Sequence, residues 1–225
     1  MQRKLVRQGK TALTVTLPKK WTNFNNLEAG NLVEINEEEN KLILCSQESK
    51  KTKKSISIEL SSGKSNEFRS IIGGLYRGGY DEIKVRYNDP NIIQELQKTV
   101  NSLFGFEIFD IDPKRCTIRS VFREESSNID SHFRRMLHGV KVMQNQIIKD
   151  MTEKKYNSKE LILQYRNNIL KQRDIIARII VQEKLLDSKH FPYYLLAFNV
   201  WSVSRNYYFM YLHWVEAEKI SNKSQ

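Results

Sequence analysis

The sequence predicts a mixed α+β protein in which short strands are followed by an alternating α/β segment and then by an antiparallel three-helix bundle. Strict alternation of apolar residues is confined to short runs before residue 122, whereas helical spacing dominates after residue 124. Between these runs, strand and helix patterns alternate. We divide the chain into residues 1–48, a basic linker at 49–54, a small α/β domain at 55–122 and a helical bundle at 123–219.

Residues 1–48 predict two strand pairs joined by a short helix. LVRQG precedes TALTVTL, and LPKKWTNFNN forms the helical turn, with Pro18 at its first position. Val33 and Ile35 then face Leu42 and Leu44 in a hairpin with an acidic turn. With so few large apolar residues, a segment of this size is marginal as an independent fold, so we expect a homodimer.

The next segment, SQESKKTKKS (46–55), is polar and rich in lysine without periodicity, which is typical of a solvated linker. The alternative is an additional tail that contacts phosphate. Residues 55–122 predict the order βαβαββ. The elements are SISIEL, NEFRSIIGGLYRGG, DEIKVRY, a helix opened by Asp89 and Pro90 and ended by Gly105, FEIFDI and CTIRSVF.

The remainder predicts three helices of a bundle, because apolar residues recur at spacings of three and four. The first stripe is Ile129, Phe133, Met136, Val140, Met143, Ile147 and Met151, and the second is Leu161, Tyr165, Ile169, Ile176 and Ile180. A third helix runs from Pro192 to about Ala217 and is apolar nearly all round. Either the bundle buries it fully, or a partner protein covers one side.

The composition favours a polyanionic partner. Lys and Arg outnumber Asp and Glu by 37 to 26, which gives a net charge of +11 and suits nucleic acid or an anionic surface. Two distant cysteines and the absence of a secretory signal pattern suit a reducing cytoplasm. The apolar run 193–214 carries Arg205 near its middle, so we expect a buried helix and no membrane insertion.

The first twenty residues contain Arg3, Lys4, Arg7, Lys10, Lys19 and Lys20 and no acidic residue. A strand pair with basic turns can present such side chains to phosphates and base edges of double-stranded DNA. Lysine on an edge strand can also simply deter aggregation, but this explains scattered lysines better than an acid-free stretch.

Several residues of this segment resemble the AbrB/SpoVT-type swapped-hairpin domain over residues 1–46. They are Arg3-Lys4-Leu5-Val6 before Gly9-Lys10, then Val15-x-Leu17-Pro18-Lys19-Lys20-Trp21, then Leu27-x-x-Gly30-Asn31-x-Val33-x-Ile35. The resemblance implies a homodimeric β-barrel whose interleaved hairpins bind DNA through Arg3, Lys10, Lys19 and Lys20. Arg7 of the same basic stretch completes our candidate set. Asn31 replaces the usual Asp and can make the same local turn bonds.

The rest of the chain resembles the archaeal PhoU-like phosphate uptake regulators in its order of segments, including GGYDEIKV and FGFEIFDID. One helical repeat fits instead of the usual two. Family members bind metal clusters through carboxylates four residues apart. Asp174 matches one such position, but Leu170, Ser204 and Tyr208 replace the others. Hard cations need several oxygen ligands, so we expect no metal and no cofactor.

The leading hypothesis is therefore a DNA-binding transcriptional regulator of phosphate uptake. The alternatives are a signalling adaptor whose bundle binds a transporter or kinase, and an antitoxin-type regulator. No nucleotide-binding or hydrolase motif is present, and we interpret His132, His138, His190 and His213 as structural, so we expect no enzyme. Glu124, Glu125 and Asp130 suit the start of a helix better than catalysis.

Overall fold

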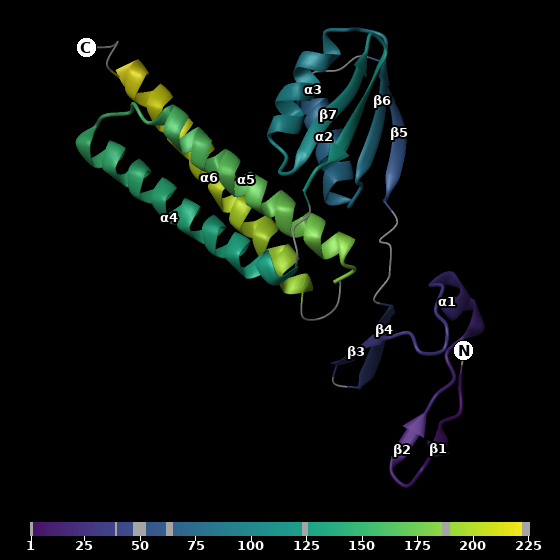
Figure 1. Ribbon diagram of the computed structural model, residues 1–225. Coiled ribbons are helices and arrows are strands. Elements are labelled where there is room, and N and C mark those ends of the chain that lie inside the picture. Colours follow the sequence, from purple (N-terminus) through teal and green to yellow (C-terminus); the bar gives the residue numbers. More distant parts are fainter. Residues whose placement is uncertain are drawn as a thin grey trace. The chain divides into compact units, whose positions relative to one another are not determined.

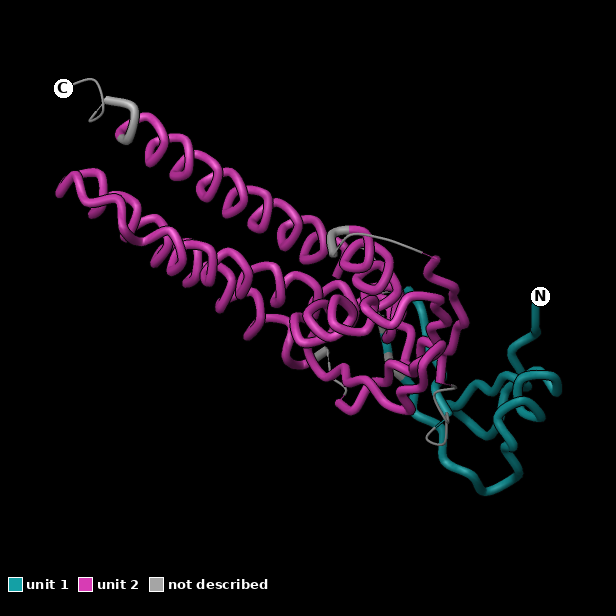
Figure 2. Tube along the Cα trace, turned by 90° about the horizontal axis from the view of Figure 1, so that it is seen from above, with its two compact units in different colours: residues 1–52 teal, residues 53–225 magenta. Residues whose placement is uncertain are grey.

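The computed structural model describes residues 2–38, 40–46, 53–61, 65–122, 126–185 and 190–221. It divides into two compact units, Met1–Thr52 (unit 1) and Lys53–Gln225 (unit 2), which Figure 2 distinguishes by colour. The described elements are a mixture of helices and strands, labelled in Figure 1, so the α+β class is confirmed. The predicted linker lies largely outside the described residues.

Unit 1 contains two separate antiparallel strand pairs and one short helix. Strand β1 (Val6–Gln8) pairs with β2 (Ala12–Thr14), and β3 (Val33–Glu38) pairs with β4 (Lys41–Ser46). Helix α1 (Lys19–Phe24) begins after Pro18, one residue later than we predicted. Ile35 faces Leu44 in the β3–β4 register, as the alternation of the sequence predicts. The second strand is shorter than the predicted run TALTVTL.

A side-chain bond of Asn31 supports the turn before β3. Its Oδ1 accepts a hydrogen bond of 2.6 Å from the backbone N–H of Glu28. Gly30, the preceding residue, has a φ of +95°, in the region that a side chain disfavours. Asn31 thus makes the local turn bond that we expected of it in place of Asp.

Unit 1 has almost no core of its own. Among its described residues only Ser46 is buried, and no closed barrel is present in the described part of this single chain. Nine large apolar side chains are between 40% and 80% exposed: Leu5, Val6, Leu13, Val15, Phe24, Leu32, Ile35, Leu42 and Ile43. One chain alone therefore does not form the barrel that the resemblance implies for a homodimer.

The first half of unit 2 has the predicted order βαβαββ. Strands β5 (Ser55–Leu60), β6 (Glu82–Tyr87), β7 (Phe106–Asp112) and β8 (Arg115–Ser120) form one sheet in the order β5-β6-β8-β7. Only β5 and β6 are parallel. Along β6, Ile83, Val85 and Tyr87 are buried while Lys84 and Arg86 are exposed, so one face of the sheet is covered.

Helices α2 (Ser65–Arg77) and α3 (Ile92–Asn101) supply the covering layer. Phe68, Ile72 and Tyr76 of α2 and Leu96 and Val100 of α3 belong to the same buried cluster as the sheet. Helix α3 begins two residues after Pro90, and Asp89 accepts a bond from the backbone N–H of Asn91. It ends at Asn101, before Gly105, whose φ is +70°. Cys116 lies in this core, and burial raises the pKa of its thiol to about 11.

The second half of unit 2 contains the three long helices that the sequence predicts. They are α4 (Ile129–Glu153), α5 (Lys159–Gln182) and α6 (Phe191–Ser221), and each packs against the other two (Figure 1). Most of the two predicted stripes lies in or against their shared core. Met151 and Leu161 do not, because they are 37% and 40% exposed near the end of α4 and the start of α5.

A buried polar network fixes the connection between α4 and α5. Asp150 is 3% exposed, and its carboxylate accepts bonds from the Tyr211 hydroxyl (2.5 Å), the Ser158 hydroxyl (2.9 Å) and the Gln146 amide (2.8 Å). Burial opposes ionisation of Asp150, but these bonds outweigh it and hold the pKa of the carboxyl below its ordinary value. Burial and the same carboxylate raise the pKa of Tyr211 to about 12.

Helix α6 is not fully buried by the bundle. Its exposed apolar side chains are Phe191, Leu195, Leu196, Phe198, Val203, Phe209 and Met210. Its opposite side, with Ala197, Ser204 and Tyr211, is buried. None of the helices, within the residues described, combines the length and apolarity needed to cross a membrane.

Candidate nucleic-acid interface

The β1–β2 hairpin places Lys10 in its turn. Gln8 pairs with Ala12, so Gly9, Lys10 and Thr11 make the reversal. Gly9 has a φ of +70°, which glycine adopts without the steric cost of a Cβ. The Thr14 hydroxyl donates to the Val6 carbonyl at 3.1 Å across the same pair. The turn therefore holds the Lys10 side chain exposed at the end of the hairpin.

Lys19 and Lys20 are the first two residues of α1, directly after Pro18. The backbone N–H groups of Trp21 and Thr22 both donate to the Pro18 carbonyl, which closes the first turn of the helix. Trp21 is half-buried whereas both lysines are exposed. The short helix thus partly covers Trp21 and leaves both ammonium groups accessible.

Arg3 precedes the same hairpin. Arg7 lies in its first strand and pairs with Leu13 in the β1–β2 register. Together with Lys10, Lys19 and Lys20 they are all exposed. Across the described residues none of these five side chains forms an ion pair. Unit 1 therefore leaves all five predicted cations available to an external anion.

The acidic side chains of unit 1 follow later in the chain. Glu34 and Glu37 lie on β3, in the second strand pair, and are exposed. The strand pairs β1–β2 and β3–β4 belong to different sheets. The β1–β2 hairpin thus carries basic side chains and no acidic one, which favours an anion there.

The positions that would hold a metal in the PhoU-like pattern are occupied otherwise. Leu170 and Ser204 are buried, and the Asp174 carboxylate binds the guanidinium groups of Arg77 and Arg173. Within the described part of the chain, no group of three His, Cys, Asp or Glu is arranged to hold a metal ion. Elemental analysis of the purified protein is the measurement that checks the prediction of no metal cluster.

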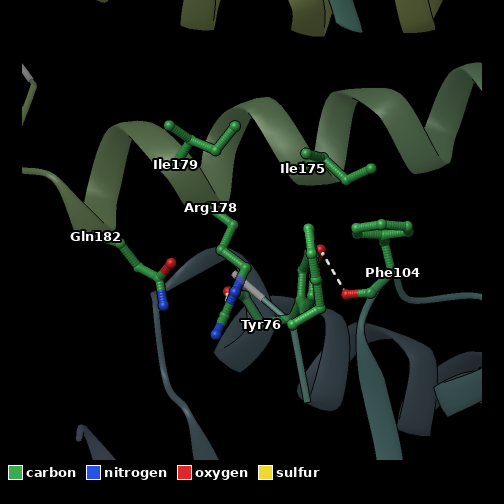
Figure 3. Close-up of a pocket in the computed structure, with 7 residues that line it drawn as sticks. Tyr76, Phe104, Ile175, Arg178, Ile179 and Gln182 are labelled. Atoms are coloured by element: carbon green, nitrogen blue, oxygen red, sulfur yellow. Dashed lines mark hydrogen bonds between the residues drawn. The ribbon is translucent and has the colours of Figure 1, made fainter. Parts of the chain in front are cut away.

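A small cavity lies where α5 meets the α/β half of unit 2, and Figure 3 shows most of its lining. Arg178 reaches from α5 and donates to the carbonyls of Tyr76 (2.8 Å) and Tyr80 (2.7 Å) and to Asp81 (3.0 Å). Gln182 also donates to Asp81, at 2.9 Å. The cavity measures about 10 Å³, room for about one water molecule. These contacts join α5 to the α/β half of unit 2, and the cavity between them is too small for a ligand larger than water.

Sequence reasoning missed a second concentration of positive charge. It consists of arginines on α2, α5 and α6, namely Arg69, Arg77, Arg166, Arg173 and Arg205, of which Arg173 is 5% exposed. No local motif marks these residues, because they come from three helices that are distant in the sequence.

Comparison of the chain with protein-family models, with curated proteins and with solved structures gave no match.

Proposed function

We propose that the protein is a DNA-binding transcriptional regulator that acts as a homodimer, with unit 1 as its DNA-binding and dimerisation domain. The observation that carries this proposal is the basic stretch of residues 3–20, with six cations and no acid. Its side chains Arg3, Arg7, Lys10, Lys19 and Lys20 are exposed. Exposed, unpaired cations on a hairpin and a helix start are suited to phosphate contacts, which dominate affinity for duplex DNA.

The exposed apolar side chains of unit 1 support a homodimer. Two isolated hairpins without a shared core are marginal in water. Full burial of one large apolar side chain contributes about 1.5–3 kcal/mol, so half-burial of nine per chain in a dimer contributes on the order of 15–25 kcal/mol. Association costs roughly 4–15 kcal/mol. A second copy of unit 1 is therefore a sufficient remedy, and a swapped-hairpin barrel of the AbrB/SpoVT type is the arrangement we propose.

Phosphate uptake is the proposed regulatory role, and it rests on the resemblance of residues 55–219 to archaeal PhoU-like regulators. The order of an α/β segment and a three-helix bundle is in keeping with that resemblance. DNA binding by unit 1 would then place the protein in the cytoplasm.

Two measurements on the full-length protein test the proposal. Light scattering should give twice the chain mass of 26.6 kDa, and fluorescence anisotropy should show binding to duplex DNA that weakens steeply with salt. Selection from a random duplex library would then supply the operator sequence. A monomer that binds no duplex at 50 mM salt would contradict the proposal.

One observation favours a second candidate, a signalling adaptor that binds a protein partner through the bundle. The exposed side of α6 carries Leu196, Val203 and Met210 at intervals of seven residues, so they form one stripe along the helix. Such a stripe on a long helix is suited to another helix. An adaptor without DNA binding would show no salt-dependent affinity for duplex, which separates the two candidates.

A further inference from the structure

Arginines from three helices of unit 2 form one connected cluster. Arg77 of α2 donates to Asp174 Oδ1 at 3.1 Å, and Arg173 of α5 donates to the same oxygen. The Arg173 guanidinium carbon lies 4.4 Å from the centre of a Trp201 ring, and that of Arg205 lies 5.3 Å from the same ring. The chain of contacts therefore runs from α2 through α5 to α6.

Arg166 and Arg69 belong to the same cluster. Arg166 precedes Arg173 by two turns of α5, and its guanidinium carbon lies 5.3 Å from the Tyr208 ring of α6. Burial lowers the pKa of Arg166, and repulsion from Arg69 and Arg205 lowers it further. Arg69 of α2 donates to the Ser102 hydroxyl at 3.1 Å. Arginines on α2, α5 and α6 are thus close enough to repel one another.

The cluster has too little negative charge. Asp174 is the one carboxylate, among the residues described, that pairs with any of these arginines, and Arg77 and Arg173 share one of its oxygens. Arg69, Arg166 and Arg205 have no carboxylate partner there. Five guanidinium groups against one carboxylate repel one another, and water screens this repulsion less at the buried Arg173 and the half-buried Arg69, Arg77 and Arg166 than at the exposed Arg205.

Two hydrogen-bond donors in the cluster are also unsatisfied. Arg166 Nε and Trp201 Nε1 are both enclosed and have no hydrogen-bond partner. Leaving such a donor buried and unpaired costs about 1–3 kcal/mol, so native structures rarely do so without a reason.

Neither the neighbouring rings nor water accounts for these features. The Tyr208 ring beside Arg166 supplies no conventional acceptor for the guanidinium N–H groups, so Arg166 Nε stays unsatisfied. A water molecule could accept one of these bonds but would not offset the repulsion. An oxyanion accepts several hydrogen bonds and also supplies the negative charge that offsets the repulsion between the arginines.

We propose that Arg69, Arg166, Arg205 and Trp201 bind a small, doubly charged oxyanion, of which inorganic phosphate is the simplest. The planar guanidinium donors match phosphate oxygens, and three cations without carboxylate partners favour a dianion over a monoanion. The phosphate can be free or be the terminal group of an organic phosphomonoester. This proposal is independent of DNA binding, because it concerns unit 2 alone.

Isothermal titration calorimetry on the full-length protein tests this site, in a buffer without phosphate, sulfate or DNA. The two ligands are inorganic phosphate and AMP, a phosphomonoester. We expect at least one to bind with a Kd below about 1 mM. The double variant R166M/R205M should weaken that binding at least tenfold. If inorganic phosphate binds, the ligand of the site is the free anion. If AMP binds and inorganic phosphate does not, the ligand is a phosphomonoester.

The control variant is R86M/R135M, which removes the same charge from exposed positions on β6 and α4. It should bind like the parent. Thermal unfolding supplies a second readout, because removing Arg166 and Arg205 relieves repulsion when no anion is bound. R166M/R205M should therefore melt at or above the parent temperature without phosphate, and below it at saturating phosphate. No binding of either ligand to the parent at 10 mM, equal losses in both variants, or equal destabilisation in both buffers would overturn the proposal.

Discussion

Replacing Lys10, Lys19 and Lys20 by alanine in the full-length protein should weaken DNA binding and make it less dependent on salt. All three side chains are exposed, and none forms an ion pair within the described ranges. The substitutions therefore break no internal contact of these side chains. Lys10 lies in a turn opened by Gly9, so its backbone tolerates the change. Any loss of affinity then reports the loss of contacts with DNA.

The expected magnitude follows from counterion release. Each phosphate contact contributes about 0.9 to the slope of log affinity against log salt, and a dimer carries each of the three lysines twice. If all six lysines meet phosphates, the slope falls by about 5, and if half do, by about 2.7. For each phosphate contact, raising the salt concentration from 0.15 M to 1 M therefore lowers the affinity for DNA about fivefold.

Fluorescence anisotropy with a labelled duplex, from 50 to 300 mM salt, measures both quantities. The charge-matched control K141A/K149A/K159A removes three exposed lysines from α4 and α5 and should leave the slope within about one unit of the parent. Replacing the linker residues Lys50, Lys51, Lys53 and Lys54 should also have a much smaller effect. A triple variant that binds as tightly as the parent, with an equal slope, would refute the assignment of this hairpin to DNA.

Three further changes test the dimer and the two polar networks. Leu13→Asp should convert the dimer to monomer in light scattering, whereas Leu137→Asp, on another exposed site in α4, should not; dimers in both would exclude unit 1 as the interface. Asp150→Asn should lower the free energy of unfolding by about 2–4 kcal/mol at neutral pH. The pKa of Asp150 is lowered in the folded state, so the loss of stability in the variant should be complete above the ordinary carboxyl pKa and should vanish as the pH falls through the lowered pKa. A loss of stability that does not depend on pH would contradict this reasoning. Arg178→Met, which removes a donor from the Tyr76 and Tyr80 carbonyls and breaks the ion pair with Asp81, should cost about 2–4 kcal/mol in urea unfolding, against under about 0.5 kcal/mol for the exposed Arg134→Met.

Periodicity predicted the order and type of the elements in unit 2, because one apolar face per element is a local property of the sequence. It failed at element ends. Met151 and Leu161 continue the apolar spacing but lie close to the α4–α5 connection, where the neighbouring helix no longer covers them. It also gave no reason for glycine within α2. A Cβ on the buried Gly73 would lie 3.3 Å from Arg77 Nη1, so glycine leaves room for that guanidinium.

Unit 1 shows the opposite case, in which sequence predicts the local pairing but one chain does not complete the fold. The β3–β4 register follows from alternation, yet Ile35 and Leu42 remain 57% and 68% exposed. Alternation fixes which side chains share a face, and it does not specify the surface that covers them. The resemblance implies that a second copy of the chain covers these side chains, and the mass measured in solution tests this.

The two basic regions carry different weight as indications of a ligand. An exposed lysine costs the fold almost nothing, so Lys10 or Lys19 alone could serve solubility, and the acid-free run around them gives the stronger evidence. A partly buried arginine is costly, since desolvation and repulsion both oppose its charge. Arg166 bears both costs and leaves Nε unsatisfied. Its contacts come from Tyr208 and, electrostatically, from Arg69, which is 97 residues away in the sequence, so no local pattern could reveal it. The net charge of +11 thus predicted an anionic partner, and only the packing of α2, α5 and α6 indicates that a second, smaller anion has a place of its own.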